Sequence, residues 1–242
     1  MSTNILILAA GSVGFEAHDG GYPLCLTEVD GMPLLERLVE NTRGIHNSHY
    51  VYALLDKDVE RFHLDAIAEL ITPGATVVRV PGSTQGSACT ALLAASGLDK
   101  NAELLVISAN ELIDINLAEV LETFRDGGLD GGTITFRSVH PRYSYVRLND
   151  QGLVTEAAQQ NPISQSATAG VFWFARVSEF VEATKNLIRK NATADGKFYV
   201  APTYNELILK QKRIGVYPIN NNHYHPLKTE RQIQKFEQGV CE

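Results

Sequence analysis

The segment from Leu8 to Gly14 has residue types and spacing suited to binding phosphate groups. An apolar run at 5–8 leads directly into the small-residue turn Ala9-Ala10-Gly11-Ser12-Val13-Gly14. Backbone N–H groups in such a turn can meet a base and its phosphates. A close connection from a strand to a helix needs the same small residues, so tight packing is the alternative interpretation.

The charge around this turn is unusual for a phosphate site. The chain contains no Lys or Arg before Arg37, and the acidic residues in that span are Glu16, Asp19, Glu28, Asp30 and Glu36. The whole chain has a formal net charge of −7 at pH 7. An anionic ligand would therefore depend on local hydrogen-bond donors and local cations.

Two further clusters contain residue types that bind metals. Asp56-Lys57-Asp58 has the Asp-x-Asp spacing of GT-A glycosyltransferases, but Asp is also favoured where a helix begins. His223 and His225 share a face if their segment is extended. Two His residues without a nearby Cys seldom form a zinc site, so a metal centre is not the expected role of this pair.

The elements that must position these residues alternate through the first half of the chain. Apolar runs predict strands, and helical periodicity predicts helices. The expected strands are 5–8, 50–55, 76–80 and 104–108, and the expected helices are 34–41, 59–70, 87–95 and 117–124. This alternation predicts a mostly parallel sheet with helices on both faces and with ligands at the carboxyl ends of the strands.

The pattern changes from Gly127 onward. Strands are expected at 131–136, 145–148, 169–175 and 213–217, and helices at 178–189 and 204–210. The bulky aromatic residues Trp173 and Tyr199 are expected to pack rather than to stack on a ligand. Since no repeat, low-complexity segment or linker interrupts the sequence, one domain over 1–242 is expected.

The composition excludes several classes of function. Of the 242 residues, 44% are hydrophobic and 20% are charged, as in ordinary globular proteins. The negative net charge disfavours binding to nucleic acid and to anionic membranes. Cys25, Cys89 and Cys241 form neither a disulfide framework nor a zinc pattern. With no secretion signal at the N-terminus, the expected location is the reducing cytoplasm.

Four sequence blocks, taken in order, resemble the sugar-phosphate nucleotidyltransferases, also called nucleoside-diphosphate-sugar pyrophosphorylases. The blocks are LAAG (8–11) with PLCL (23–26) and GMPLLE (31–36), then GSACTALLA (86–94), then NPIS (161–164) with ATAGVFWF (167–174), and then FYVAPTYNELI (198–208). They are most similar to the branch tied to capsule and cell-surface polysaccharide synthesis. The resemblance implies a single-domain α/β fold of the GT-A-like Rossmannoid nucleotidyltransferase type, with a mixed, mostly parallel central sheet.

The resemblance also implies that the two halves of the chain bind different parts of the ligand. Residues 1–126 would form a nucleotide-binding half, and residues 127–242 a half that binds sugar phosphate. The implied nucleotide-binding residues are Leu8, Ala9, Ala10, Gly11, Gln85, Gly86 and Asn110. The implied sugar-side residues are Gln159, Gln160, Gly170 and Asn205. Gly86 has a second interpretation, as a helix start packed tightly on the sheet.

The family reaction joins a nucleoside triphosphate to a sugar 1-phosphate and releases pyrophosphate, with Mg²⁺ as the cofactor. The charged positions on which this chemistry depends are neutral here. Phe15 and Leu24 stand where the family has Arg and Lys, Asn110 and Gln232 stand where it has metal-binding Asp, and Gln159-Gln160 replaces Glu-Lys. Asn and Gln keep the shape and hydrogen-bonding capacity of the acids but cannot offset the charge of Mg²⁺.

Two interpretations of function follow from these substitutions. The protein is an enzyme of this family that uses Mg²⁺, or it is a catalytically inactive homologue that binds a nucleotide, a nucleotide sugar or a protein partner, including a second copy of itself. Glu111 and Asp114 are the candidates to replace the missing metal ligand. Against them, Glu111 should face away from Asn110 if the strand continues, and Asp114 suits the cap of the helix expected from 117.

Overall fold

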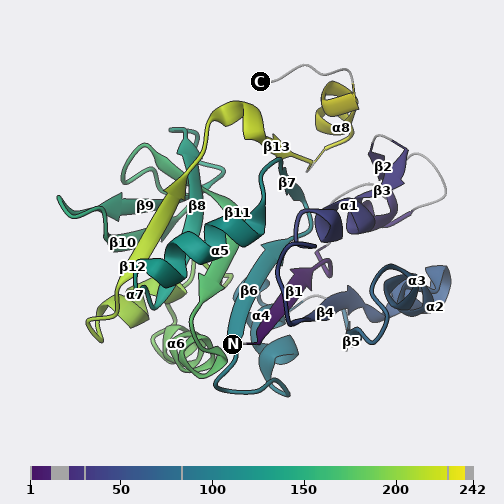
Figure 1. Cartoon of the computed structure of the whole chain (residues 1–242), viewed down its shortest axis with the longest axis horizontal. Helices are drawn as coiled ribbons and strands as arrows, with labels where there is room; N and C mark the ends of the chain where they lie inside the picture. The colour runs from purple at the N-terminus through teal and green to yellow at the C-terminus, as the bar shows by residue number, and fades with distance from the viewer. Residues whose placement is uncertain (1, 12–21, 30, 83, 228, 238–242) are drawn as a thin grey trace.

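The strands form one mixed sheet whose central members are parallel. The computed structural model describes residues 2–11, 22–29, 31–82, 84–227 and 229–237. The strands β5 (Thr76–Val80), β4 (Ser48–Leu55), β1 (Thr3–Leu8) and β6 (Glu103–Ser108) lie side by side and parallel (Figure 1). The strand β11 (Ser166–Phe174) continues the sheet antiparallel to β6. The expected α/β class and mixed, mostly parallel sheet are confirmed.

The second half of the chain extends the sheet on both sides of β11. One branch holds β9 (Ser144–Leu148) and β10 (Val154–Gln159), and the other holds β8 (Gly131–Arg137) and β12 (Ile214–Pro218). The pairing of β11 with β8 shifts register between Thr168 and Phe172, and Gly170 in this bulge has φ +72°. A bulge bends its strand and redirects the side chains around it.

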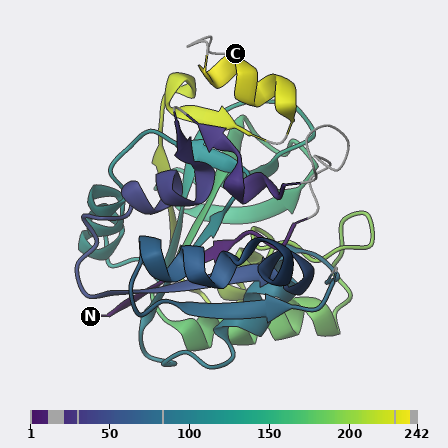
Figure 2. The same ribbon diagram turned by 90° about the vertical axis from the view of Figure 1, so that its right-hand side faces the viewer.

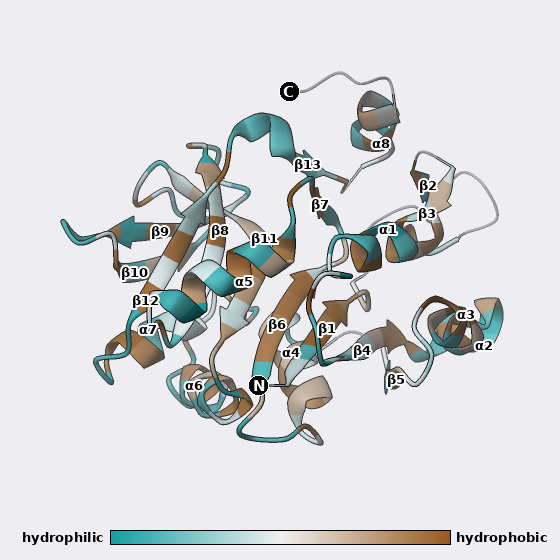
Figure 3. Cartoon of the chain, viewed as in Figure 1, coloured by the Kyte–Doolittle hydropathy of each residue, from teal (hydrophilic) through white to brown (hydrophobic). Residues whose placement is uncertain are grey.

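Helices cover both faces of the sheet, because the strands are apolar on both sides. In β1, Ile5 and Ile7 join the core on one face, whereas Leu6 joins the core on the other. Figure 3 shows this continuous apolar character along β1 and β6. The helices on the first face are α1 (Leu34–Glu40), α2 (Asp56–Phe62), α3 (Leu64–Ile71), α5 (Leu117–Asp126) and α8 (Glu230–Glu237). Those on the second face are α4 (Ser87–Ala95), α6 (Val177–Arg189) and α7 (Thr203–Ile208). Figure 2, seen from the β5 edge, shows α6 across the sheet from α2 and α3.

Short elements complete the fold near the carboxyl ends of β1 and β6. They are the 3-10 turns η1 (Leu24–Leu26) and η2 (Asn221–His223), and the strands β2 (Glu28–Val29), β3 (Met32–Pro33), β7 (Glu111–Ile113) and β13 (Tyr224–Pro226). The strand β13 pairs antiparallel with β7. The C-terminal part of the chain is thereby brought next to the end of β6, where Leu227 donates its N–H to the Asn110 carbonyl at 3.0 Å.

Several expected elements differ from the structure. The single helix expected at 59–70 is two helices, because the chain turns at His63, whose φ is +54°. The strand β10 was not expected, since its sequence VTEAAQ contains Ala, Glu and Gln, which are poor strand formers. The short strands β7 and β13 were also missed, because each is stabilised by pairing with the other. None of the described helices combines the length and apolar character needed to cross a membrane.

Candidate functional site

Two adjoining cavities open at the carboxyl ends of β1 and β6. The β1 cavity has a volume of about 330 Å³ and is lined by Leu8, Ala9, Ala10, Gly11, Leu24, Cys25, Thr84, Gly86, Ser87, Thr90, Ser108, Ala109, Asn110, Lys197 and Tyr199. The β11 cavity has a volume of about 160 Å³ and is lined by Ser87, Ser108, Asn110, Glu111, Arg142, Tyr143, Ser144, Gln159, Thr168, Gly170, Phe172, Tyr199, Val200 and Ala201. Four residues belong to both linings: Ser87, Ser108, Asn110 and Tyr199. The cavities therefore form one continuous cleft where open α/β sheets bind ligands.

The turn after β1 is fixed by hydrogen bonds to both neighbouring strands. Ala9 donates its N–H to the Ala53 carbonyl at 3.0 Å, and Ala109 donates its N–H to the Leu8 carbonyl at 3.1 Å. The small side chains of Ala9, Ala10 and Gly11 leave the β1 cavity open beside them. The first four expected nucleotide-binding residues are thus together, whereas the expected Ser12–Gly14 part of the turn and Phe15 lie outside the described residues.

Gly86 joins the start of α4 to a segment from the second half of the chain. Its φ is +112°, and an added Cβ would overlap the Phe198 carbonyl oxygen and lie 2.8 Å from the Phe198 nitrogen. Phe198 donates its N–H to the Gln85 carbonyl at 2.8 Å and accepts from the Ala88 N–H at 3.1 Å. Gly86 also lines the β1 cavity, so tight packing and a place at the site coexist. Gln85 is exposed and lies outside both linings.

Leu24 and Cys25 give the β1 cavity an apolar wall. Both side chains are buried, and Leu24 occupies the position where the resemblance expects a Lys. Burial, together with the negative charge of Asp58, raises the pKa of the Cys25 thiol to about 12. Cys25 is therefore a neutral packing group at pH 7 rather than a nucleophile.

Asn110 and Glu111 both face the cleft, which corrects the expectation that they point to opposite sides. The chain turns at 109–110 between β6 and β7, so the strand alternation does not apply there. Asn110 lines both cavities, and Glu111 lines the β11 cavity although its side chain is buried, with the residue only 8% exposed. A Cβ on Gly170 would lie 2.9 Å from the Glu111 Cδ and would overlap its Oε2.

The electrostatic surroundings of Glu111 include three other side chains. Burial raises the pKa of Tyr224 well above its ordinary value, and the negative charge of Glu111 and the electrostatic interaction with Tyr143 act in the same direction. The positive charge of Arg142 opposes this shift. A buried carboxylate, a guanidinium and two tyrosine hydroxyls therefore influence one another at this end of the sheet.

The structure separates the two Gln residues that replace the family's Glu-Lys. Gln159 lines the β11 cavity, and its Oε1 accepts a hydrogen bond from the Ser144 hydroxyl. Gln160 has φ +55° and is exposed outside both linings, and its N–H donates to the Tyr143 carbonyl at 2.9 Å. Only the first of the pair is placed to meet a ligand in this cavity.

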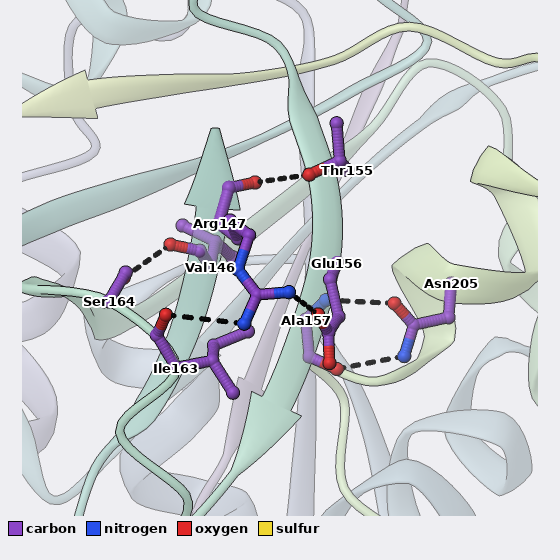
Figure 4. A network of polar contacts seen from close by, with 8 residues as sticks. All are labelled: Val146, Arg147, Thr155, Glu156, Ala157, Ile163, Ser164 and Asn205. Carbon is purple, nitrogen blue, oxygen red and sulfur yellow. Dashed lines mark hydrogen bonds and ion pairs between the residues drawn. The ribbon is translucent and has the colours of Figure 1, made fainter. Parts of the chain in front are cut away.

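Asn205 lies outside both cavities and completes the edge of β10. Its Oδ1 accepts from the Ala157 N–H and its Nδ2 donates to the Ala157 carbonyl, both at 2.8 Å. Figure 4 shows the Asn205 side chain reaching from α7 to Ala157. The same view shows Ser164 bound to the Val146 carbonyl, a contact of 2.6 Å that fixes the loop before β11. Asn205 was expected on the sugar side, but both polar atoms of its side chain are used to bind the backbone of β10.

Neither of the candidate metal ligands belongs to a cluster that fits a metal. Asp114 is exposed beside Glu40 and Asn41, away from the cleft, and the residue that caps α5 is Asn116, whose Oδ1 accepts from the Ala118 N–H at 3.0 Å. Where the chain is described, Glu111 is the one carboxylate that lines either of the two cavities. Within the described part of the chain, no group of three or more His, Cys, Asp or Glu side chains is arranged to hold a metal.

The Asp-x-Asp cluster at 56–58 and the pair of His residues at 223 and 225 form contacts with other parts of the fold outside the cleft. Asp56 begins α2 and pairs with Arg79 at 3.3 Å, and neither it nor Asp58 lines the two cavities. The His223 Nδ1 lies 3.0 Å from the Asp114 carbonyl oxygen, and His225 packs against Phe236. The Asp-x-Asp glycosyltransferase interpretation therefore has no support from the geometry of the cleft.

Tyr199, Lys197 and Arg142 are cleft residues that sequence analysis missed or misassigned. Tyr199 was expected to pack, yet it lines both cavities. Lys197 is the one charged residue among the described residues that line the β1 cavity, and Arg142 lies in the β11 cavity with Glu111. Lys197 directly precedes the block that resembles the family's sugar side, which is the one signal in the sequence that favoured it.

Solved structures of other proteins share this fold over nearly the whole chain. No protein-family model matches the sequence, and no curated protein sequence matches it. The structure is similar to the nucleoside-diphosphate-sugar pyrophosphorylase from Vibrio cholerae RC9, with a TM-score of 0.82 and 20% identity over 98% of this chain and 99% of that one. The identity is low enough that this likeness establishes the fold alone.

Two further solved structures contain nucleotide ligands. A UDP-glucose pyrophosphorylase complexed with UDP-glucose has a TM-score of 0.75 and 15% identity, covering 98% of both chains. HddC from Yersinia pseudotuberculosis complexed with GMP-PN has a TM-score of 0.65 and 13% identity, covering 97% of this chain and 98% of that one. The fold is therefore shared over its full length with proteins that hold nucleotides and nucleotide sugars.

Proposed function

We propose that this protein is a nucleotidyltransferase of the nucleoside-diphosphate-sugar pyrophosphorylase type, which holds a nucleotide in the β1 cavity and a sugar in the β11 cavity. The observation that carries this proposal is the continuity of the two cavities through Ser87, Ser108, Asn110 and Tyr199. A nucleotide sugar has two bulky parts joined by phosphates, and it needs two adjoining cavities with a polar junction. The shared fold supports the same assignment.

The lining of the β1 cavity is suited to a planar base. Leu8, Ala9, Ala10 and Leu24 supply apolar walls, as in most small-molecule sites. The Ala9 N–H is bonded to Ala53, so among the described residues of this turn the amides of Ala10 and Gly11 are the backbone donors that a ligand would meet. Segments from both halves of the chain line this cavity, because Lys197 and Tyr199 belong to the second half.

The proposed reaction takes place at the junction of the cavities. An oxygen of the sugar 1-phosphate attacks the α-phosphorus of the nucleoside triphosphate, and pyrophosphate leaves. Such reactions ask the protein for positioning and for neutralisation of the phosphates. The hydroxyl groups of Ser87 and Ser108 and the amide of Asn110 lie at this junction and can donate hydrogen bonds to the reacting phosphate.

The donor set of the cleft does not fit the Mg²⁺ site that the resemblance implies. Mg²⁺ prefers carboxylate oxygens and phosphates in an octahedral arrangement. Asn110 occupies the expected ligand position with a neutral amide, and Glu111 is the single carboxylate among the described residues of the two linings. The side chains described for this cleft therefore provide no metal-dependent step, and the charge of the phosphates must be met by other groups.

A variant that fills the β1 cavity tests the nucleotide site. A Cβ on Gly11 would meet nothing within 4 Å, so Gly11→Leu fits the fold while extending into the cavity. Gly97→Leu is the matched control, because a Cβ there also meets nothing within 4 Å and Gly97 lies outside both linings. Titration with UDP-glucose and with each nucleoside triphosphate should show binding to the parent and to Gly97→Leu, and at least about tenfold weaker binding to Gly11→Leu. Equal affinities in all three proteins would refute the site.

A second candidate function is a catalytically inactive homologue that binds the same ligands. The observation that favours it is the neutral Asn110 at the junction of the two cavities. The triple variant Phe15→Arg, Leu24→Lys, Asn110→Asp restores the charged family positions. Pyrophosphate release by the triple variant, together with none by the parent, would establish the inactive homologue, and Mg²⁺-dependent turnover by the parent would exclude it.

A further inference from the structure

The positive charge in the cleft comes from residues far from the N-terminal motifs. The chain has no Lys or Arg before Arg37, and Leu24 lies in the wall where the resemblance expects a Lys. Among the described residues that line the two cavities, the cations are Lys197 in the β1 cavity and Arg142 in the β11 cavity, and the carboxylate is Glu111. In a chain with a formal net charge of −7, these described linings carry more positive than negative charge.

Lys197 is held in a defined position although it is exposed. Residues 194–197 form a tight turn in which Ala194 and Lys197 exchange two backbone hydrogen bonds of 3.0 Å. The next residue, Phe198, is bonded to both Gln85 and Ala88 and packs directly on Gly86. The backbone of Lys197 is therefore fixed relative to the start of α4, and within the described structure its ammonium group forms no ion pair or hydrogen bond.

Arg142 is positioned by its own local contacts before β9. Its N–H donates to the His140 Nδ1 at 3.2 Å, and its guanidinium carbon lies 4.8 Å from the centre of the Tyr143 ring. Tyr143 is buried and also lines the β11 cavity. A guanidinium stacked on a buried ring loses little freedom when it binds an anion, and its planar donors match phosphate oxygens.

The amides at the start of α4 do not supply this charge. The N–H groups of Ala88, Cys89 and Thr90 are bonded to the carbonyls of Phe198 and Gly86. These three amides are therefore not available to a phosphate placed beside α4. Since Ser87 and Tyr199 line both cavities, a group placed against them lies between the cavity of Lys197 and the cavity of Arg142.

We infer that Lys197 and Arg142 bind the phosphates of the ligand, one from each cavity, in place of the basic residues that the N-terminal motifs lack. The inference rests on the proposed function, because the phosphates belong to the same nucleotide or sugar phosphate. It goes beyond that function by assigning anion recognition to two residues of the second half of the chain. Both cations are exposed, so their replacement leaves the core intact.

The test measures binding of inorganic pyrophosphate by isothermal titration calorimetry at low salt. The variants are Lys197→Gln and Arg142→Gln, and the controls are Lys185→Gln and Arg176→Gln, which remove exposed cations outside both linings. The inference predicts that pyrophosphate binds the parent and both controls equally. Each cleft variant should bind at least about tenfold more weakly and with a smaller dependence on salt.

Two outcomes would overturn the inference and are distinguishable from failure of the proposed function. Either the parent does not bind pyrophosphate, or the cleft variants bind it as tightly as the parent does. If nucleotides still raise the melting temperature of the parent in either case, the nucleotide site stands and the assignment of its cations is wrong. If nucleotides also fail to bind, the proposed function fails as well.

Discussion

Gly86 packs so closely on Phe198 that no side chain fits between them: a Cβ on Gly86 would overlap the Phe198 carbonyl oxygen. The contact joins the loop before α4, in the first half of the chain, to the segment that carries Lys197 and Tyr199. Gly86 lines the β1 cavity, as do Lys197 and Tyr199 on either side of Phe198 in the sequence. The shape of the cleft therefore depends on one glycine that connects the two halves of the sequence.

Replacing this glycine should damage both stability and binding. Gly86→Ala combines a φ of +112° with overlap of backbone atoms that cannot move independently, so we expect a loss of at least about 2 kcal/mol in the free energy of unfolding. Gly82→Ala is the control, because its φ is +80° but a Cβ there meets nothing within 4 Å. Urea denaturation should show that the control loses roughly 1 kcal/mol in the free energy of unfolding. Equal losses in the two variants would mean that the contact with Phe198 does not matter.

A second glycine should be coupled to the buried carboxylate. Gly170→Ala would push a Cβ against the Glu111 carboxyl group, whose Cδ lies 2.9 Å away. We expect Gly170→Ala to lower the free energy of unfolding by about 2 kcal/mol or more. Adding Glu111→Ala should recover at least about 1 kcal/mol of this loss, because the smaller side chain removes the overlap. A double-mutant cycle by urea denaturation measures this coupling. Strict additivity would show that Glu111 and Gly170 do not touch in solution.

The edge of β10 should depend on the amide of Asn205. Asn205→Asp keeps the size of the side chain but places a carboxylate oxygen against the Ala157 carbonyl, where an N–H donates at 2.8 Å. We expect the free energy of unfolding to fall by about 1–3 kcal/mol. Asn101→Asp, at an exposed position, should be nearly neutral. Since Asn205 lies outside both cavities, affinity for nucleotides should not change, and a selective loss of affinity without a loss of stability would restore its sugar-side role.

The stability of the fold should fall in acid through Glu103. Burial raises the pKa of this carboxyl group. Hydrogen bonds from Arg125 and Thr3 and the positive charge of Arg125 lower the same pKa by more, so the pKa in the folded protein is below its ordinary value. The Arg125 guanidinium lies 2.5 Å from the Glu103 Oε2. A lowered pKa stabilises the fold above the unfolded-state pKa of about 4.3, and this stability is lost as the pH falls through the folded-state pKa.

The corresponding measurement is the melting temperature of the parent and of Glu103→Gln between pH 7 and pH 3. The variant should be less stable at pH 7, and the difference should shrink below about pH 4.3 as the parent carboxylate becomes protonated. Glu122→Gln, at an exposed position on α5, serves as the control. A difference that stays constant across this range would show that the Glu103 carboxylate contributes no charge-dependent stability.

The central strands could be predicted from the sequence because their local signal and their tertiary environment agree. β5 and α4 have the expected bounds, and β1, β4 and β6 begin one or two residues earlier than expected. Both faces of β1, β4 and β6 are buried, so their predicted segments are continuous apolar runs. By contrast, β10 is an edge strand of polar and small residues that pairs with β9 and Asn205, and such partners are invisible in a local pattern.

The parts of the site that belong to a sequence motif could be predicted, whereas the parts that come from later loops packed against that motif could not. Leu8–Gly11 include the end of β1 and the turn that follows it, and Gly86 lies between β5 and α4, so their place at the strand ends could be expected from the alternation of elements. Lys197 and Arg142 are single charges in loops. The one signal that favoured Lys197 is its position directly before a block of the resemblance, and nothing in the sequence around Arg142 distinguishes a cleft residue from a solvated one. Glu111 was misplaced because the chain turns between β6 and β7, which breaks the alternation on which the expectation rested.

The most direct test of the central claim, that this cleft binds a nucleotide, is a thermal-shift panel on the parent protein. The ligands are CTP, UTP, dTTP, GTP and ATP, each measured with and without Mg²⁺. A ligand at about 100 times its dissociation constant adds roughly 2.7 kcal/mol, which for a chain of this size raises the melting temperature by about 5–10 °C. We predict such a rise for at least one nucleotide, and we predict that it persists without Mg²⁺, because the described cleft offers a cation pair rather than a metal site. No rise with any of the five nucleotides would contradict the claim.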